Sequence, residues 1–326
     1  MTPIWKKKPA LGIGLGVGLL GALALALRLR RRDFRSFIPD SITPAIFATR
    51  ACDTSRGRIV YHISGSGQPL LFLHSIYPGA SSYEWSKIYG RFTSGADVIA
   101  PDLIGFGESE RPANPLDGDE HVESLAEFLR RVTMHKASVV ASGLTSQLAL
   151  LLAARHPDLV SKVFLFLPSA FRHSAQRHLF QLPSHSLTVL NRARYHKLTS
   201  STHSVKKWLG RMFEDEAKIS TEHIEVIGSC ARQYGAAHAI NGLHKHRGTF
   251  QPTSRMADVI APVHIVWPAK ALAFPETEAT SLCRSLPCAS LDLLPSSSLL
   301  SPLENPDVIA QALERWCASL PIAISA

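Results

Sequence analysis

Residues 137–157 read ASVVASGLTSQLALLLAARHP, and this stretch decides the fold. Its first five residues form a nearly continuous apolar run, which is typical of a strand covered on both faces of a parallel sheet. The small residues that follow, at 141–143, permit a sharp turn, and residues 146–156 then show an apolar pattern typical of a helix. A buried strand that turns abruptly into a helix predicts an α/β protein.

The same alternation of strands and helices recurs on both sides of this stretch. Further strands are predicted at Ile59–Ile63, Pro69–Leu73, Asp97–Ala100, Lys162–Leu167, Pro262–Trp267 and Ala289–Leu294, and further helices at Asp119–Thr133 and Pro306–Ser319. We therefore predict an α/β fold with a doubly wound, mostly parallel sheet.

Residues 169–258 interrupt this alternation with helical patterns, many His and Arg residues and no buried strand, which indicates a helical insertion. Its histidines are His173, His178, His185, His196, His203, His223, His238, His244 and His246. They form no HExxH pattern and no carboxylate-supported cluster, so we expect solvated surface side chains and no metal. The GIGLGVG run at 12–18 does not follow a strand, so it is no dinucleotide site, and no cofactor is expected.

Most of the net positive charge is concentrated in the N-terminal segment. The chain has a net charge of +9, and residues 1–35 hold eight basic residues and one acidic residue. The remainder is nearly neutral, which argues against a nucleic-acid partner. Residues 10–27 are eighteen uncharged residues that would span roughly 27 Å as a helix, close to the thickness of a bilayer core. We therefore expect a transmembrane helix over 9–27.

Other features of the sequence bear on whether this segment is cleaved, what it contacts and how it is oriented in the membrane. A cleaved signal peptide is disfavoured because the run ends in RLRRR and not in a small-residue cleavage site. Gly14 and Gly18 have the spacing of a helix-contact motif, so other transmembrane helices are candidate partners. The excess of arginine after the run places the C-terminal domain on the cytoplasmic side of a single-pass protein. Five scattered cysteines without a CxxC pair suggest reduced thiols, in agreement with that side.

Four landmarks occur in a fixed order: the strand LLFLH ending at His74, the strand and turn VIAPDLIGFGES at 98–109, the turn ASGLTS at 141–146, and the strand at 262–267 with the segments after it. In these landmarks the chain resembles the α/β-hydrolase superfamily, in the branch of epoxide hydrolases, haloalkane dehalogenases and esterases. The resemblance covers about residues 58–320 and implies that the helical insertion is a cap over the active site.

The resemblance also implies a nucleophile at the sharp turn, an acid after a later strand and a histidine in the last loop. These positions fall on Gly143, Ala271 and Leu299, so all three chemical groups are absent. The oxyanion-binding amides implied by the resemblance are those of Ile76 and Leu144.

A displaced catalytic set is the rival hypothesis. Ser142 would then be the nucleophile, with Thr145 and Ser146 as neighbouring hydroxyls, His74 or a histidine of the cap as a base, and Asp102 as an acid. The alternative for His74 and Asp102 is a structural role in organising the loops beside the pocket.

The predicted organisation is a basic tail (1–8), a transmembrane helix (9–27), a basic tether and edge strand (28–57), a first core part (58–168), the cap (169–258), a second core part (259–320) and a tail (321–326). The predicted function is a membrane-anchored, hydrolase-like pseudoenzyme. It would be a binding module with a small apolar ligand between cap and core, or a structural subunit of a membrane assembly. The alternative is an active esterase-like or lipase-like hydrolase that uses Ser142.

Overall fold

The computed structural model describes residues 46–168, 188–245, 255–271, 274–296 and 298–318. These residues contain one eight-stranded sheet in the order β1-β2-β4-β3-β5-β6-β7-β8. The strands are β1 (Ala48–Thr54), β2 (Gly57–Gly65), β3 (Gln68–Leu73), β4 (Ala96–Pro101), β5 (Ala137–Ser142), β6 (Val160–Phe166), β7 (Val263–Pro268) and β8 (Ala289–Leu294). β2 pairs antiparallel with β1 and β4, and all other neighbours are parallel. The predicted mostly parallel sheet is confirmed.

The helices of the sheet domain are α2 (Gly118–Val132), α3 (Thr145–Arg155), α9 (Glu276–Ser285), α10 (Ser301–Glu304) and α11 (Pro306–Ala318). Short 3-10 helices are η2 (Ser82–Trp85), η3 (Tyr89–Phe92), η4 (Glu216–Lys218) and η6 (Met256–Asp258). α2 begins with a capping box, in which Asp117 and Glu120 each bond the other's backbone amide.

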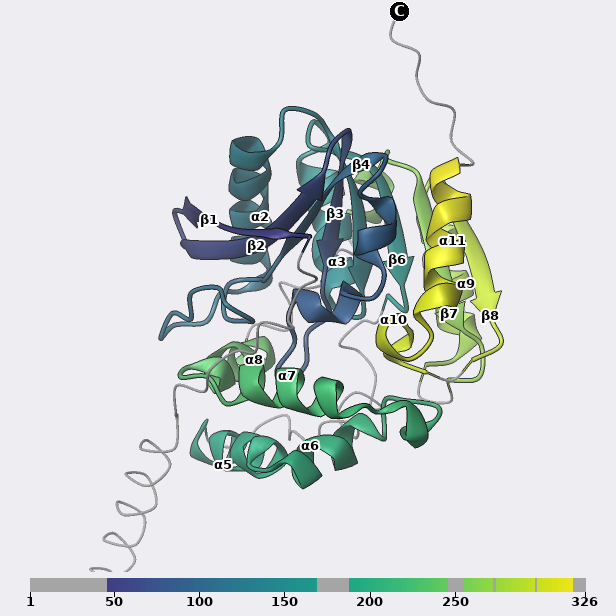
Figure 1. The fold of residues 1–326 in the computed structure, drawn as a ribbon. Helices are drawn as coiled ribbons and strands as arrows, with labels where there is room; N and C mark the ends of the chain where they lie inside the picture. The colour runs from purple at the N-terminus through teal and green to yellow at the C-terminus, as the bar shows by residue number, and fades with distance from the viewer. Residues whose placement is uncertain (1–45, 169–187, 246–254, 272–273, 297, 319–326) are drawn as a thin grey trace, which may run out of the picture.

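Register across the sheet shows which helices cover which face. Phe72 and Phe164 lie in one row of side chains through β3, β5 and β6. Trp85 packs on Phe72 and Trp316 of α11 packs on Phe164, with ring centroids 5.5 and 5.6 Å apart. η2 and α11 therefore share one face, and α11 crosses the near face of the sheet in Figure 1. α2 packs on the other face, where Phe128 contacts a tyrosine of β2.

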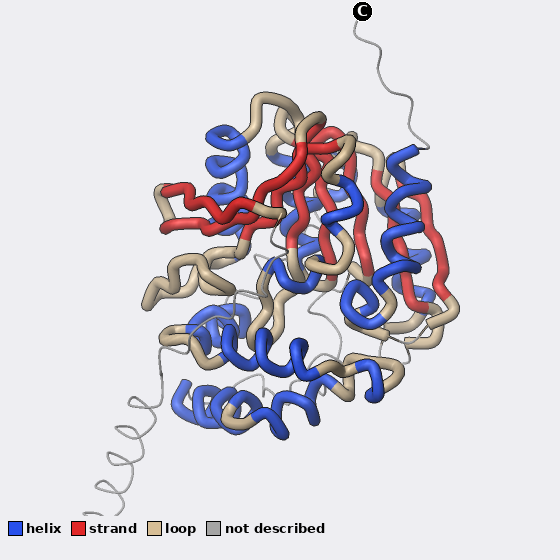
Figure 2. Tube along the Cα trace, in the orientation of Figure 1, coloured by secondary structure: helices blue, strands red, loops and turns tan. Residues whose placement is uncertain are grey.

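Between β6 and β7 the described chain holds α5 (Thr188–Thr199), α6 (Thr202–Leu209), α7 (Thr221–Ala231) and α8 (Ala236–Lys245). Figures 1 and 2 show that these four helices form a layer beneath the carboxyl ends of the parallel strands. They lie within 169–258, the range that the sequence assigns to the cap. Ligands in open α/β sheets bind at this same edge.

The predicted transmembrane helix at 9–27 lies outside the described residues, as do the tails at 1–8 and 321–326 and the first part of the tether. Within the described ranges, no helix combines the length and apolar character needed to cross a bilayer.

The prediction that the cap histidines are solvated is wrong for His223, whose side chain is buried. His223 is the third residue of α7, where its ring accepts a hydrogen bond from the Ser220 amide while the Ser220 hydroxyl caps the His223 amide. This reciprocal cap draws the ring in from solvent. The five cysteines are all free thiols, as expected from their spacing.

The cap is fastened to the core at two places. Gly79, in the loop after β3, has φ +83° and lies against the backbone carbonyl of Ile227 in α7. At the second place, the Glu304 carboxylate accepts hydrogen bonds from the amides of Glu214 and Asp215, at 2.9 and 2.8 Å. The cap thus packs directly on the loops that surround the end of β5.

Gly79→Ala tests this docking. An added Cβ would overlap the Ile227 carbonyl oxygen at a left-handed φ, so we expect a loss of about 2–5 kcal/mol in the free energy of unfolding. Gly95→Ala is the matched control, because nothing lies within 4 Å of the added Cβ there. Urea denaturation of both variants measures the difference, and equal stability of the two would contradict the close packing of α7 on this loop.

Candidate active site

The turn between β5 and α3 has the geometry that the sequence predicts for a nucleophile elbow. Gly143 adopts φ +54°, and its amide donates to the Phe166 carbonyl of β6 at 2.9 Å. Thr145 opens α3 and its hydroxyl donates to the His74 carbonyl at 2.6 Å. The left-handed backbone would lift a side chain at 143 clear of the sheet. Glycine has no such side chain, so the elbow carries no nucleophile.

The other two triad-equivalent positions hold apolar side chains with structural contacts. Ala271 follows β7 in a tight turn, is buried, and its amide donates to the Pro268 carbonyl at 3.2 Å. Leu299 is partly buried against the core, and its amide donates to the Met212 carbonyl of the cap at 2.8 Å. Neither side chain can accept a proton, so these two positions supply no charge relay to Gly143.

His74, the base of the displaced set, is fully buried with both ring nitrogens engaged. Nε2 accepts from the Leu103 amide at 3.0 Å, and Nδ1 lies 2.7 Å from the Ser75 carbonyl oxygen. Because Nε2 accepts, the proton is on Nδ1 and is donated to Ser75. Burial lowers the pKa of His74 and keeps the ring neutral. Through these contacts His74 bridges two loops, which is a structural role.

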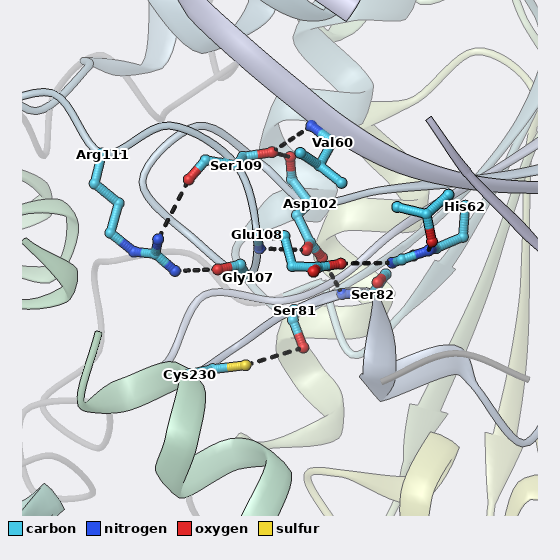
Figure 3. A network of polar contacts seen from close by, with 11 residues as sticks. Val60, His62, Ser81, Ser82, Asp102, Gly107, Glu108, Ser109, Arg111 and Cys230 are labelled. Atoms are coloured by element: carbon cyan, nitrogen blue, oxygen red, sulfur yellow. Dashed lines mark hydrogen bonds and ion pairs between the residues drawn. The ribbon is translucent and has the colours of Figure 1, made fainter. Parts of the chain in front are cut away.

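Asp102, the acid of the displaced set, is likewise committed to backbone amides. Its Oδ1 accepts from the Ser82 amide at 2.6 Å and its Oδ2 from the Glu108 amide at 2.7 Å. Figure 3 shows the carboxylate at the centre of the loop that runs from Asp102 to Arg111. Asp102 therefore organises this loop, the structural role considered for it above.

Ser142 is held by a carboxyl group that sequence reasoning missed. Its hydroxyl donates to Glu84 of η2, and the other Glu84 oxygen accepts from the Ser75 amide at 2.8 Å. Both side chains are at most 2% exposed. Burial raises the pKa of Glu84 to about 7, against smaller lowering effects from hydrogen bonds of Ser142, Ser75 and Tyr77. The signal in the sequence was a single acidic residue between two aromatic residues, in SYEW at 82–85.

The amides of Ile76 and Leu144 are the implied oxyanion donors. Ile76 lies in the loop after β3, and Leu144 is the residue before α3. Among the described residues, neither amide donates to a protein acceptor. Ser146 is buried with its hydroxyl unpartnered in that same part of the chain.

A small pocket lies away from the elbow, between the loop at 104–116 and the cap helix α8. Arg111 and His121 supply its polar lining, with Leu116 and Ala239 among its apolar residues. Burial lowers the pKa of His121 to about 4, so the ring is neutral at physiological pH. None of the three triad-equivalent residues lines this pocket.

An open, mostly parallel sheet with a sharp strand-to-helix elbow and a helical cap over the strand ends defines the α/β-hydrolase fold. A family model described as alpha/beta hydrolase fold matches residues 68–194. Together with the similarities to known hydrolases given below, this match shows that the chain belongs to the α/β-hydrolase superfamily.

Two curated relatives illustrate the similarity. The 2-hydroxymuconate semialdehyde hydrolase of Pseudomonas sp. (strain CF600) is 35% identical over 106 residues, which is 32% of this chain and 38% of that protein. Epoxide hydrolase 3 of Xenopus tropicalis is 26% identical over 64% of this chain and 61% of its own length. The chain thus matches less than two thirds of the length of these relatives.

Solved structures share the fold at low identity. The epoxide hydrolase CorEH superposes with a TM-score of 0.73 at 17% identity, over 84% of this chain and all of that chain. A bacterial membrane phospholipase A superposes with a TM-score of 0.70 at 19% identity, over 93% of this chain and 97% of that chain.

The pKa of Glu84 predicts a pH-dependent stability. Between its ordinary pKa of 4.5 and the raised value of about 7, the folded protein holds a proton that the unfolded chain has lost. The free energy of unfolding therefore falls as pH rises, by about 1.4 kcal/mol per pH unit at most. Glu84→Gln removes this dependence, so its stability relative to the wild type should increase from pH 5 to pH 7 and then level off.

Urea denaturation across this pH range measures that difference. The buried histidines titrate in both proteins, so subtracting the two curves isolates Glu84. A difference that is independent of pH would show that Glu84 is already ionised at pH 5 in the folded protein.

Proposed function

We propose that this protein is a membrane-anchored α/β-hydrolase-fold protein that does not perform triad hydrolysis. It would serve as a binding or structural subunit of a membrane assembly, with other transmembrane helices as partners. The observation that carries the proposal is Gly143 at the elbow, with Ala271 and Leu299 at the two partner positions. Loss of a nucleophile or of its base reduces hydrolysis by several orders of magnitude.

The contacts around the elbow support a structural use of the fold. The Leu299 amide is bound to Met212 of the cap, and the Ser296 hydroxyl donates to the Glu214 carboxylate of the cap at 2.8 Å. In an active enzyme this loop would present the histidine. Here the same loop ties the cap to the core. A small apolar ligand between cap and core is the binding form of this proposal.

A second function, an active esterase-like or lipase-like hydrolase, is favoured by one observation. Ser142 donates to Glu84, and a carboxylate with a pKa of about 7 can accept a hydroxyl proton at neutral pH. The burial of both side chains weighs against it, because a nucleophile must reach its substrate. If this function holds, ester hydrolysis by the wild type is lost in both Ser142→Ala and Glu84→Gln.

Gly143→Ser tests the inactive elbow. The φ of +54° costs a non-glycine residue about 1–2 kcal/mol, so the variant should fold with a modest loss of stability. It should not hydrolyse p-nitrophenyl esters above the rate without protein, because Ala271 and Leu299 supply no relay. Thermal unfolding reports the fold and a colorimetric assay the activity.

Measurable turnover by the folded Gly143→Ser variant would contradict the proposal. It would show that another group acts as the base, and Glu84, which binds the neighbouring Ser142, would be the first candidate.

Membrane anchoring rests on the apolar run at 10–27 and its basic flanks, and the arginine excess after the run supports a cytoplasmic C-terminal domain. The double substitution Leu19→Arg and Leu20→Arg places two charges at the centre of that run, where each is costly in a bilayer. The wild type should remain in the membrane pellet after alkaline carbonate extraction, and the double variant should move to the supernatant.

Met134→Arg is the control, because Met134 is an exposed apolar residue of the folded domain and should have no effect on partitioning. Extraction of the wild type into the supernatant would contradict the anchor.

A further inference from the structure

His62 of β2 is a buried histidine with an unusual hydrogen-bond pattern. Its ring is 0% exposed, and Nδ1 lies 3.1 Å from the hydroxyl oxygen of Thr49 on β1. Nε2 has no hydrogen-bond partner in the described part of the chain. Buried polar nitrogens are almost always satisfied, so an orphaned one calls for an explanation.

The orphaned nitrogen is directed at two carboxylates. His62 Nε2 lies 3.7 Å from Glu108 Oε2, which is too long for a hydrogen bond. One ligand atom from each of His62, Asp102 and Glu108 falls within 4.8 Å of the others. Figure 3 shows the three side chains converging from β2 and from the loop after β4.

The surroundings hold these groups in place. The Ser82 and Glu108 amides fix the two oxygens of Asp102, and each oxygen keeps a second lone pair. Gly107 has φ +49°, and a Cβ there would overlap the Asp102 carboxylate, so the loop wraps closely around it. Glu108 is about one-third exposed on its side chain, which leaves a route from solvent.

An ion pair does not account for this arrangement. His62 Nε2 makes no hydrogen bond to either carboxylate, whereas a charged ring paired with a carboxylate would donate one. In the tautomer with the proton on Nδ1, the ring donates to the Thr49 hydroxyl and directs the Nε2 lone pair at the two carboxylates. The three groups together form a donor set that suits a metal cation. Metal-binding histidines are commonly oriented in this way by a partner of the other nitrogen.

We propose that His62, Asp102 and Glu108 bind a divalent first-row transition-metal ion such as Zn²⁺. Two zinc ligands at about 2.0–2.1 Å in tetrahedral geometry are roughly 3.4 Å apart, close to the observed 3.7 Å between His62 and Glu108. The imidazole favours Zn²⁺ over Mg²⁺ or Ca²⁺, and water would complete the coordination. This differs from the sequence-based expectation of no metal.

The ion would have a structural role. It would join β2 to the loop after β4 and, through the Asp102–Ser82 hydrogen bond, to η2, which carries Glu84. The inference stands independently of the proposed function, since none of the three ligands occupies a triad-equivalent position.

The test is titration of the chelator-treated, full-length protein in detergent with Zn²⁺, followed by calorimetry and thermal unfolding. We expect one equivalent to bind with a rise in Tm, and Glu108→Gln to weaken that binding at least tenfold. Glu123→Gln is the matched control, because Glu123 lies 3.2 Å from His156 in a surface histidine–carboxylate pair. This control should bind Zn²⁺ like the wild type.

Replacement by Co²⁺ identifies the ligands. Visible bands without thiolate charge transfer are expected, and their loss in His62→Gln would support the site. Absence of Zn²⁺ binding at micromolar concentration, equal binding by Glu108→Gln, or a thiolate charge-transfer band from the free cysteines would each overturn the proposal.

Discussion

Between β5 and α3 the chain reverses within two residues, and the left-handed backbone at Gly143 makes this possible. The Gly143 amide is bound to β6, and the Thr145 hydroxyl is bound to the carbonyl of His74 at the end of β3. Three neighbouring strand ends are therefore fixed relative to one another by this turn. The loops around it and the cap packed on those loops all take their positions from this geometry.

The polar groups near the turn hold the structure together. His74 joins two loops through both ring nitrogens, Asp102 binds two amides, and Glu84 binds Ser142 and the Ser75 amide. Each group satisfies buried donors or acceptors that would otherwise destabilise the fold. His74, Asp102 and Glu84 are residue types used in hydrolysis, and here they make structural contacts.

Sequence reasoning predicted the sheet well because its strands are continuous apolar runs, as at Ala137–Ser142, and because the order of motifs restricts the topology. It missed the helix α9, whose residues are polar on average. It also missed the burial of His223, which depends on the reciprocal hydrogen bonds with Ser220 at the start of α7. The resemblance to the α/β-hydrolase superfamily implied Gly143, Ala271 and Leu299 as the triad-equivalent positions, and the structure puts Gly143 in the expected turn.

Glu84 and the His62 cluster could not be predicted from sequence. Both depend on contacts between residues distant in the chain, such as Glu84 with Ser142 and His62 with Glu108. No local pattern encodes such contacts. Their charge state depends on burial, which is a property of the folded molecule.

The most direct test of the central claim is intact-protein mass spectrometry after exposure to a serine-reactive fluorophosphonate. A fold that has lost its nucleophile should show no covalent adduct under conditions that label an active serine hydrolase stoichiometrically. A stoichiometric adduct that disappears in Ser142→Ala would contradict the account and establish a displaced active site.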